Sequence, residues 1–253
     1  MTRYDGKVVI ITGASRGIGA GLGRAFHEAG ARVVLAARSA DALTALAEEL
    51  GDRALAVPTD VTDPASVEHL VDITLARFGR LDAAINNASG GGAPPTPIAH
   101  LPIEAFDSAI SVALRGVFLS MRYEIPAMLA TGGGAIVNMS STAGLQGIGG
   151  IAGYVTAKHG VIGLTRSAAI DYAEKGIRIN AIAPGPIGTG QNRGSAESAR
   201  RVSASLPIGR VGTVGECADV LKWLCSDAAS FVTGTTVTVD GGMLAGMKPY
   251  ARS

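Results

Sequence analysis

A glycine-rich turn near the start of the chain constrains the fold more than any other feature. This turn, Thr12–Gly19, has glycines in the pattern G-x3-G-x-G. It follows Val8–Ile11, an uncharged β-branched segment typical of a buried strand, and leads into Gly19–Ala29, whose apolar residues recur at helical spacing. In this context glycines let the backbone approach a pyrophosphate, and the helix N-terminus offers unpaired N–H groups. The sequence therefore predicts a strand–turn–helix unit that binds a dinucleotide.

Predicted strands and helices alternate from this unit to the end of the chain. Such alternation favours an α/β fold with a doubly wound parallel sheet and helices on both faces. The chain has 253 residues and shows no linker or repeat, so we expect a single domain over residues 1–253. The predicted strands are Val8–Ile11, Arg32–Ala37, Ala54–Pro58, Leu81–Asn86, Ala135–Met139, Arg178–Ala183 and Thr235–Asp240.

Three segments carry more specific predictions. A long helix begins near Ile103, and we expect Pro126 to kink or end it because proline removes a backbone donor. Pro184–Leu206 shows little strand pattern, and long loops in compact domains often act as lids, so we expect a substrate lid at about residues 186–210. Trp223 falls on the apolar face of a predicted helix, which indicates a core position.

The composition argues against several classes of partner. A formal net charge of +1 gives no electrostatic footprint for nucleic acid or an anionic membrane. Ile125–Ala157 is uncharged, but its glycines and polar residues would insert poorly into lipid. The four histidines and two cysteines form no cluster with metal-ligand spacing, so no metal site is predicted. Because two cysteines fit reduced thiols and no leader segment is recognised, we expect a cytoplasmic protein.

Tyr154 and Lys158, four residues apart, form the candidate catalytic pair. Positions i and i+4 share a helix face, so the phenol and the ammonium would lie side by side. A nearby positive charge lowers the pKa of a tyrosine, and a phenol tuned in this way can exchange a proton with an alcohol or carbonyl oxygen. Ser141, at the end of a predicted strand, is the third candidate. Ser140 competes with it, but adjacent strand residues point to opposite faces.

Together these motifs resemble the classical short-chain dehydrogenase/reductase family. The resemblance covers the chain from about Lys7 to Gly242, and it implies a Rossmann-type sheet of about seven strands. It also implies a homotetramer built on the two long helices, with a second contact near the last strand. The matching motifs are Thr12–Gly19, Asp60-Val61, Asn86-Asn87-Ala88, Ser141, Tyr154 with Lys158, and Pro184-Gly185 followed by Ile187 and Thr189.

The resemblance implies a role for each motif. Ser141 and Tyr154 would hydrogen-bond the substrate oxygen, and Lys158 would bind the nicotinamide ribose and acidify Tyr154. Asp60 would border the adenine, although a turn or cap role also fits this residue. Thr189 would orient the carboxamide. The full set of expected cofactor-binding residues is Gly13, Ser15, Arg16, Gly17, Ile18, Gly19, Arg38, Asp60, Val61, Asn87, Ala88, Tyr154, Lys158, Pro184, Ile187 and Thr189.

Two arginines bear on the type of cofactor. In the family an acidic residue at the end of the second strand would hold the ribose hydroxyls of NAD, but here Ala37 occupies that place and Arg38 follows it. Arg16 lies within the glycine turn. Two guanidinium groups could bind the additional ribose phosphate of NADP, so NADP(H) is favoured over NAD(H). Alternatively, both arginines are solvated and selectivity is set elsewhere.

Ala113 is the main departure from the family pattern. The family commonly has an asparagine here, which holds a water that links the lysine to bulk solvent. Alanine has no polar side-chain atom for this task. Either a backbone carbonyl and a nearby water replace this proton relay, or proton exchange is slower.

The resulting expectation is an NAD(P)-dependent oxidoreductase that reduces a ketone or oxidises a secondary alcohol, with Tyr154 as general acid and base. The segments Gly90–Pro97, Leu145–Gly153 and Gln191–Leu206 would form the walls of the pocket. The first two are apolar and small, which suits an uncharged small molecule. Two alternatives remain: a reductase of enoyl or dienoyl thioesters with the same fold, and an NADP-binding scaffold with little chemistry, which the missing asparagine motivates.

Overall fold

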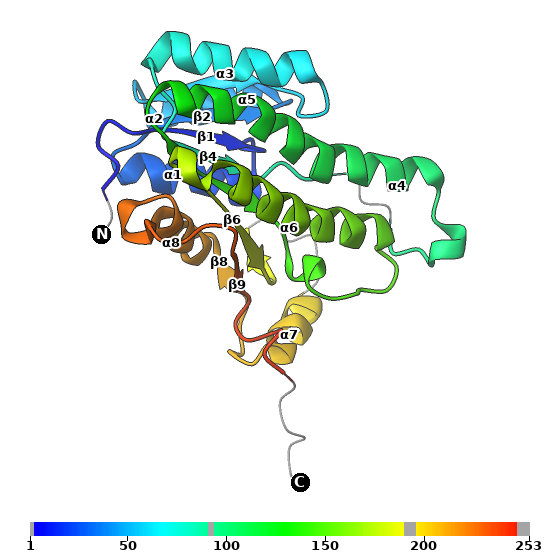
Figure 1. Ribbon diagram of the computed structural model, residues 1–253. Helices are drawn as coiled ribbons and strands as arrows, with labels where there is room; N and C mark the ends of the chain where they lie inside the picture. Colours follow the sequence, from blue (N-terminus) through cyan, green and yellow to red (C-terminus); the bar gives the residue numbers. More distant parts are fainter. Residues whose placement is uncertain (1–2, 91–93, 190–195, 247–253) are drawn as a thin grey trace.

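A parallel sheet of seven strands forms the centre of the computed structural model (Figure 1), which describes residues 3–90, 94–189 and 196–246. The strand order is β3-β2-β1-β4-β5-β6-β9, and every pairing is parallel. The predicted doubly wound sheet is therefore confirmed. The strands are β1 (Val8–Thr12), β2 (Arg32–Ala37), β3 (Ala54–Pro58), β4 (Ala83–Asn86), β5 (Gly134–Met139), β6 (Ile177–Pro184) and β9 (Thr236–Val239).

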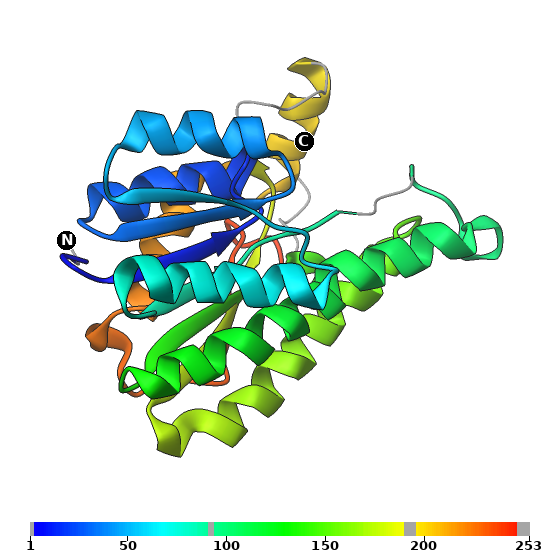
Figure 2. The ribbon, with the colours of Figure 1, turned by 90° about the horizontal axis from the view of Figure 1, so that it is seen from above.

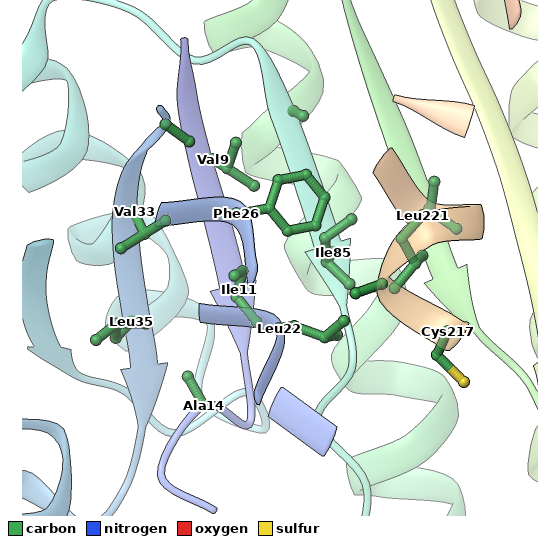
Figure 3. Close-up of a cluster of buried hydrophobic side chains, with 14 of the residues drawn as sticks. Val9, Ile11, Ala14, Leu22, Phe26, Val33, Leu35, Ile85, Cys217 and Leu221 are labelled. Carbon is green, nitrogen blue, oxygen red and sulfur yellow. The ribbon is translucent and has the colours of Figure 1, made fainter. Parts of the chain in front are cut away.

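Helices cover both faces of the sheet, which is why β1 is buried along its whole length. One core packs α1 (Gly17–Glu28), α2 (Ala40–Leu50) and α8 (Val214–Leu224) against the strands. Figure 3 shows Leu22 and Phe26 of α1 over β1 and β4, with Leu221 of α8 on the far side of Ile85. The opposite core involves α3 (Pro64–Phe78), α5 (Gly116–Ala130) and α6 (Ala152–Tyr172). The strand order reverses between β1 and β4, and ligands of this fold bind at such a reversal.

The long helix begins at Ile103 as predicted, but it does not end at Pro126. The helix runs as α4 (Ile103–Ile110), a π-helical turn (Ser111–Arg115) and α5, which continues through Pro126 to Ala130. Proline removes one backbone bond near the end of the helix, while the buried residues around it hold the last turn on the core. Figures 1 and 2 show α4 and α6 side by side, extending beyond the sheet.

The expected core position of Trp223 is also wrong, because its side chain is 39% exposed. Leu221 and Leu224, three residues apart on α8, share the face that packs on the core, and this turns Trp223 away. None of the described helices is long and apolar enough to cross a bilayer.

The segment after β6 has more regular structure than its sequence pattern suggested. A two-residue strand, β7 (Ile187–Gly188), pairs with β8 (Gly212–Thr213), and α7 (Ala196–Ser205) lies between them in sequence. Figure 1 shows α7 projecting from the layered body. Of the expected lid, residues 190–195 lie outside the described residues. Short 3₁₀ turns complete the structure at Ile98–His100, Thr142–Gly144, Ala173–Lys175 and Asp227–Ala229.

Candidate active site

A cavity of about 580 Å³ opens at the carboxyl ends of the strands, at the reversal of strand order. It gathers most of the predicted cofactor-binding residues: Gly13, Ser15, Arg16, Gly17, Ile18, Gly19, Arg38, Asp60, Val61, Asn87, Ala88 and Thr189. Six residues outside the predicted set also line it: Ala37, Ser39, Ala42, Thr59, Ser89 and Val112. Two of them could have been found from their places at strand ends, because Ala37 ends β2 and Thr59 directly follows β3.

The glycine turn is packed tightly against the end of β4. Gly13 has a φ of 68°, and a Cβ there would lie 2.9 Å from the Ala88 Cα. A Cβ on Gly19 would overlap the Gly13 carbonyl oxygen. Asn87 fixes the turn, because its amide Nδ2 donates to the Thr12 carbonyl at 2.9 Å. Only glycine fits these positions without displacement of the backbone.

The N-terminus of α1 is free to hold an anion. The side chain of Arg16, at the N-cap, makes no capping hydrogen bond, and the first turn carries no acidic residue. The first N–H groups of a helix lack partners within the helix, and its dipole favours negative charge. With the glycine turn beside it, this end of the cavity fits the pyrophosphate of a dinucleotide.

Arg16 and Arg38 are both exposed at the cavity, and Asp60 lies near the second of them. The Asp60 carboxylate accepts hydrogen bonds from the Thr62 N–H at 2.9 Å and from the Thr62 hydroxyl at 2.8 Å. These bonds hold the pKa of Asp60 below its ordinary value, and the positive charge of Arg38 lowers it further. Asp60 therefore both holds the turn through Thr62 and lines the cavity.

The structure brings Ser141, Tyr154 and Lys158 together where β5 meets α6. Tyr154 lies close enough to Ser141 for that side chain to lower its pKa. Lys158 is buried, its Nζ lies 5.6 Å from the centre of the Tyr154 ring, and it donates to the Met139 carbonyl at 2.7 Å. Ser140 points elsewhere, because its hydroxyl donates to the Lys158 carbonyl at 2.9 Å. The alternation argument thus chose the correct serine to meet the tyrosine.

The predicted lowering of the tyrosine pKa is not found. Burial raises the pKa of Tyr154, and the hydrogen bond with Ser141 opposes the rise only in part. Burial also lowers the pKa of Lys158 to about 8. The shared helix face places the ammonium over the ring and hydrogen-bonds it to a backbone carbonyl, so desolvation outweighs the effect of its charge on the phenol.

Four predicted cofactor-binding residues do not line the cavity at the glycine turn. Tyr154 and Lys158 lie with Ser141, Pro184 is buried at the end of β6, and Ile187 lines a separate cavity of about 290 Å³ with Arg210 and Glu216. Ala113 is fully buried within the π-helical turn, which packs on α6. Across the described part of the chain, no group of three or more histidine, cysteine or acidic side chains could hold a metal ion.

Comparison with known proteins agrees with this geometry. The family model described as Enoyl-(Acyl carrier protein) reductase matches residues 13–244. Cyclohexanol dehydrogenase of Acinetobacter sp. (strain SE19) is 44% identical over 242 residues, which cover 94% of this chain and 95% of that protein.

Two solved structures superpose on nearly the whole chain. The crystal structure of levodione reductase has a TM-score of 0.90 and 37% sequence identity, and the match covers 96% of this chain and 99% of that one. A 7α-hydroxysteroid dehydrogenase complexed with NADH and 7-oxo glycochenodeoxycholic acid has a TM-score of 0.89 and 35% identity, with 95% of each chain covered.

Proposed function

Since the chain belongs to the classical short-chain dehydrogenase/reductase family and is an NAD(P)-dependent oxidoreductase of alcohols and carbonyl compounds, we propose that it reduces a cyclic ketone with NADPH. The meeting of Ser141, Tyr154 and buried Lys158, in a fold whose glycine turn lines a cavity of about 580 Å³, is the observation that carries this proposal. The same three side chains argue against a non-catalytic scaffold.

When bound, the nicotinamide cofactor supplies the hydride to the carbonyl carbon, or accepts it in the reverse direction. Ser141 and Tyr154 hydrogen-bond the substrate oxygen, and Tyr154 passes its proton to that oxygen as negative charge develops there. The raised pKa of Tyr154 keeps the phenol protonated, which suits the reductive direction. Lys158 places a positive charge near the Tyr154 ring and would bind the nicotinamide ribose.

Two observations support a cyclic, uncharged substrate. Leu145 and Ile148 expose apolar surface on the loop between Ser141 and Tyr154, and the Gly150 carbonyl accepts the Thr96 N–H at 2.9 Å, which ties this loop to the facing wall. The similar proteins are named for cyclohexanol, levodione and a steroid, which are cyclic alcohols or ketones. The expected wall residues 91–93 and 191–195 lie outside the described residues.

An activity screen tests the proposed reaction. The protein is incubated with NADPH or NADH and with cyclic ketones, linear ketones and enoyl thioesters, and absorbance of the reduced nicotinamide is followed. We expect turnover with cyclic ketones to exceed turnover with linear ones. Higher turnover with the enoyl thioester would contradict the proposal and favour the alternative that the description of the family model suggests.

We propose that Arg38 helps to select NADPH. Hydrogen bonds to charged groups contribute about 1.5–3 kcal/mol, so Arg38→Ala should raise the KM for NADPH roughly 10- to 100-fold and leave the KM for NADH nearly unchanged. Steady-state kinetics with both cofactors measure this. Arg32→Ala, at the exposed opposite end of the same strand, is the matched control. An equal change in KM for both cofactors would show that Arg38 does not select between them.

We also propose a homotetramer that works in the cytoplasm. Phe118 on α5, Ile170 on α6 and Phe231 just before β9 are exposed large apolar side chains. They lie on the elements that the family resemblance assigns to subunit contacts. Burial between subunits would remove this apolar surface from water.

A further inference from the structure

A buried acid in the core, between α5 and β4, has no role in the mechanism above. Glu124, on α5, is 1% exposed, and its Oε2 accepts a hydrogen bond from Asn86 Nδ2 at 3.0 Å. Asn86 Nδ2 also donates to Asn138 Oδ1 at 3.0 Å, and Asn138 Nδ2 donates to Thr165 Oγ1 at 3.0 Å. These side chains connect α5, β4, β5 and α6 through a single polar chain inside the core.

Two atoms of this hydrogen-bond network have no partner among the described residues: Glu124 Oε1 and Asn86 Oδ1. Both are acceptors when the carboxyl is ionised, and they belong to the two groups that already share one hydrogen bond. A proton on Oε1 would turn this atom into a donor for Asn86 Oδ1. The carboxyl group of Glu124 and the carboxamide of Asn86 would then be joined by two hydrogen bonds, and both atoms would have a partner.

The network touches both halves of the active site through neighbouring residues. Asn86 precedes Asn87, which holds the glycine turn through the Thr12 carbonyl. Asn138 precedes Met139, whose carbonyl accepts the bond from Lys158. A change at Glu124 would therefore reach the cofactor cavity along β4 and the catalytic lysine along β5.

We propose that Glu124 is held as a neutral carboxylic acid and positions the ends of β4 and β5 under the active site, so that loss of its proton weakens both. The effect on catalysis rests on the proposed function, whereas the protonation of Glu124 does not.

The electrostatic surroundings agree with a retained proton. Burial raises the pKa of Glu124 to about 7, and only the hydrogen bond from Asn86 opposes the rise. The charged groups of the packed elements lie elsewhere: Glu68 and Asp72 of α3 and Arg122 of α5 line an open groove, and Lys158 of α6 is bonded to the Met139 carbonyl. Among the described residues, therefore, Glu124 has no cation beside it that would favour its ionised form.

The test compares the protein with Glu124→Gln, in which an amide of the same shape stays neutral and can keep both bonds to Asn86. A group whose pKa is raised in the folded state stabilises the fold below its unfolded value and loses this contribution as pH rises through the folded value. The unaltered protein should thus lose stability between pH 4.5 and about 7, by on the order of 10²-fold in its unfolding equilibrium. Thermal unfolding from pH 5 to 9 should show this loss, and Glu124→Gln should lack it.

Infrared spectroscopy provides a direct readout that needs no substrate. At pH 6 the unaltered protein should show a carboxylic-acid carbonyl band that Glu124→Gln lacks and that fades as pH rises through about 7. Absence of this band, or an unchanged pH dependence of stability in Glu124→Gln, would overturn the proposal whatever the enzyme turns over.

A second variant, Glu124→Leu, tests positioning. It removes both bonds to Asn86, and a misplacement of about 1 Å can cost 10²-fold in rate, so kcat should fall at least roughly tenfold while Glu124→Gln stays near the unaltered value at pH 6. Equal kcat in all three proteins would refute the positioning role. If Glu124→Leu does not fold, the Gln variant and the infrared band still decide the protonation.

Discussion

Tyr154→Phe is expected to lose about 10²–10⁴-fold in kcat, because that is the usual contribution of a general acid or base and phenylalanine has no proton to give. The ring stays the same size, so the variant should fold normally and bind NADPH with nearly unchanged affinity. Steady-state kinetics give the loss of turnover, and fluorescence titration with NADPH gives the binding. This combination assigns the hydroxyl to the chemical step.

Tyr123→Phe is the matched control for this experiment. Tyr123 lies on α5, packs against the core on the α3 side and lines the groove between these helices, far in sequence from the catalytic residues. Removal of the Tyr123 hydroxyl should leave kcat nearly unaltered. If Tyr154→Phe kept full activity, Tyr154 would have no role as the proton donor, and the proposed mechanism would fail.

Gly19→Ala should strongly weaken cofactor binding. The added Cβ would overlap the Gly13 carbonyl oxygen and lie 2.7 Å from Asn87 Nδ2, so the turn must move away from the position that holds a pyrophosphate. Overpacking of this kind costs typically 1–3 kcal/mol, and we expect Kd for NADPH to rise at least roughly tenfold. Titration with NADPH and thermal unfolding measure the two effects.

Gly163→Ala separates this steric effect from the general preference of helices for alanine. Gly163 lies within α6, and a Cβ there meets no atom within 4 Å. Alanine should stabilise the helix by about 0.5–1 kcal/mol and leave cofactor affinity unaltered. Equal affinity for NADPH in the Gly19 and Gly163 variants would show that the glycine turn does not form the pyrophosphate site.

Lys158, the proposed catalytic lysine, is a buried charged group. Lys158 is 2% exposed, and its ammonium is bonded to the Met139 carbonyl. Burial of an ammonium is costly unless hydrogen bonds compensate it, which explains why burial lowers the pKa of Lys158 to about 8. Strongly shifted pKa values cluster at functional sites, which agrees with the proposed role of Lys158.

Much of the fold and most of the site followed from local patterns. The uncharged strands, the glycine turn and the alternation of elements predicted the sheet, because burial on both faces demands apolar strands. The motifs at strand ends predicted most of the cofactor cavity, since the carboxyl ends of parallel strands meet at one edge. The helix continues past Pro126 and Trp223 is exposed, because packing of α5 and α8 on the sheet outweighed local patterns.

The sequence by itself determined the order of the elements, the glycine turn and which residues are proposed to carry the chemistry, since backbone geometry and strand alternation depend on near neighbours along the chain. Only the tertiary structure decided how those residues are tuned. The raised pKa of Tyr154, the buried ammonium of Lys158 and the core network at Glu124 arise from desolvation and hydrogen bonds between β4, β5, α5 and α6. These segments are far apart in sequence, so the exclusion of water between them cannot be predicted from the local sequence pattern.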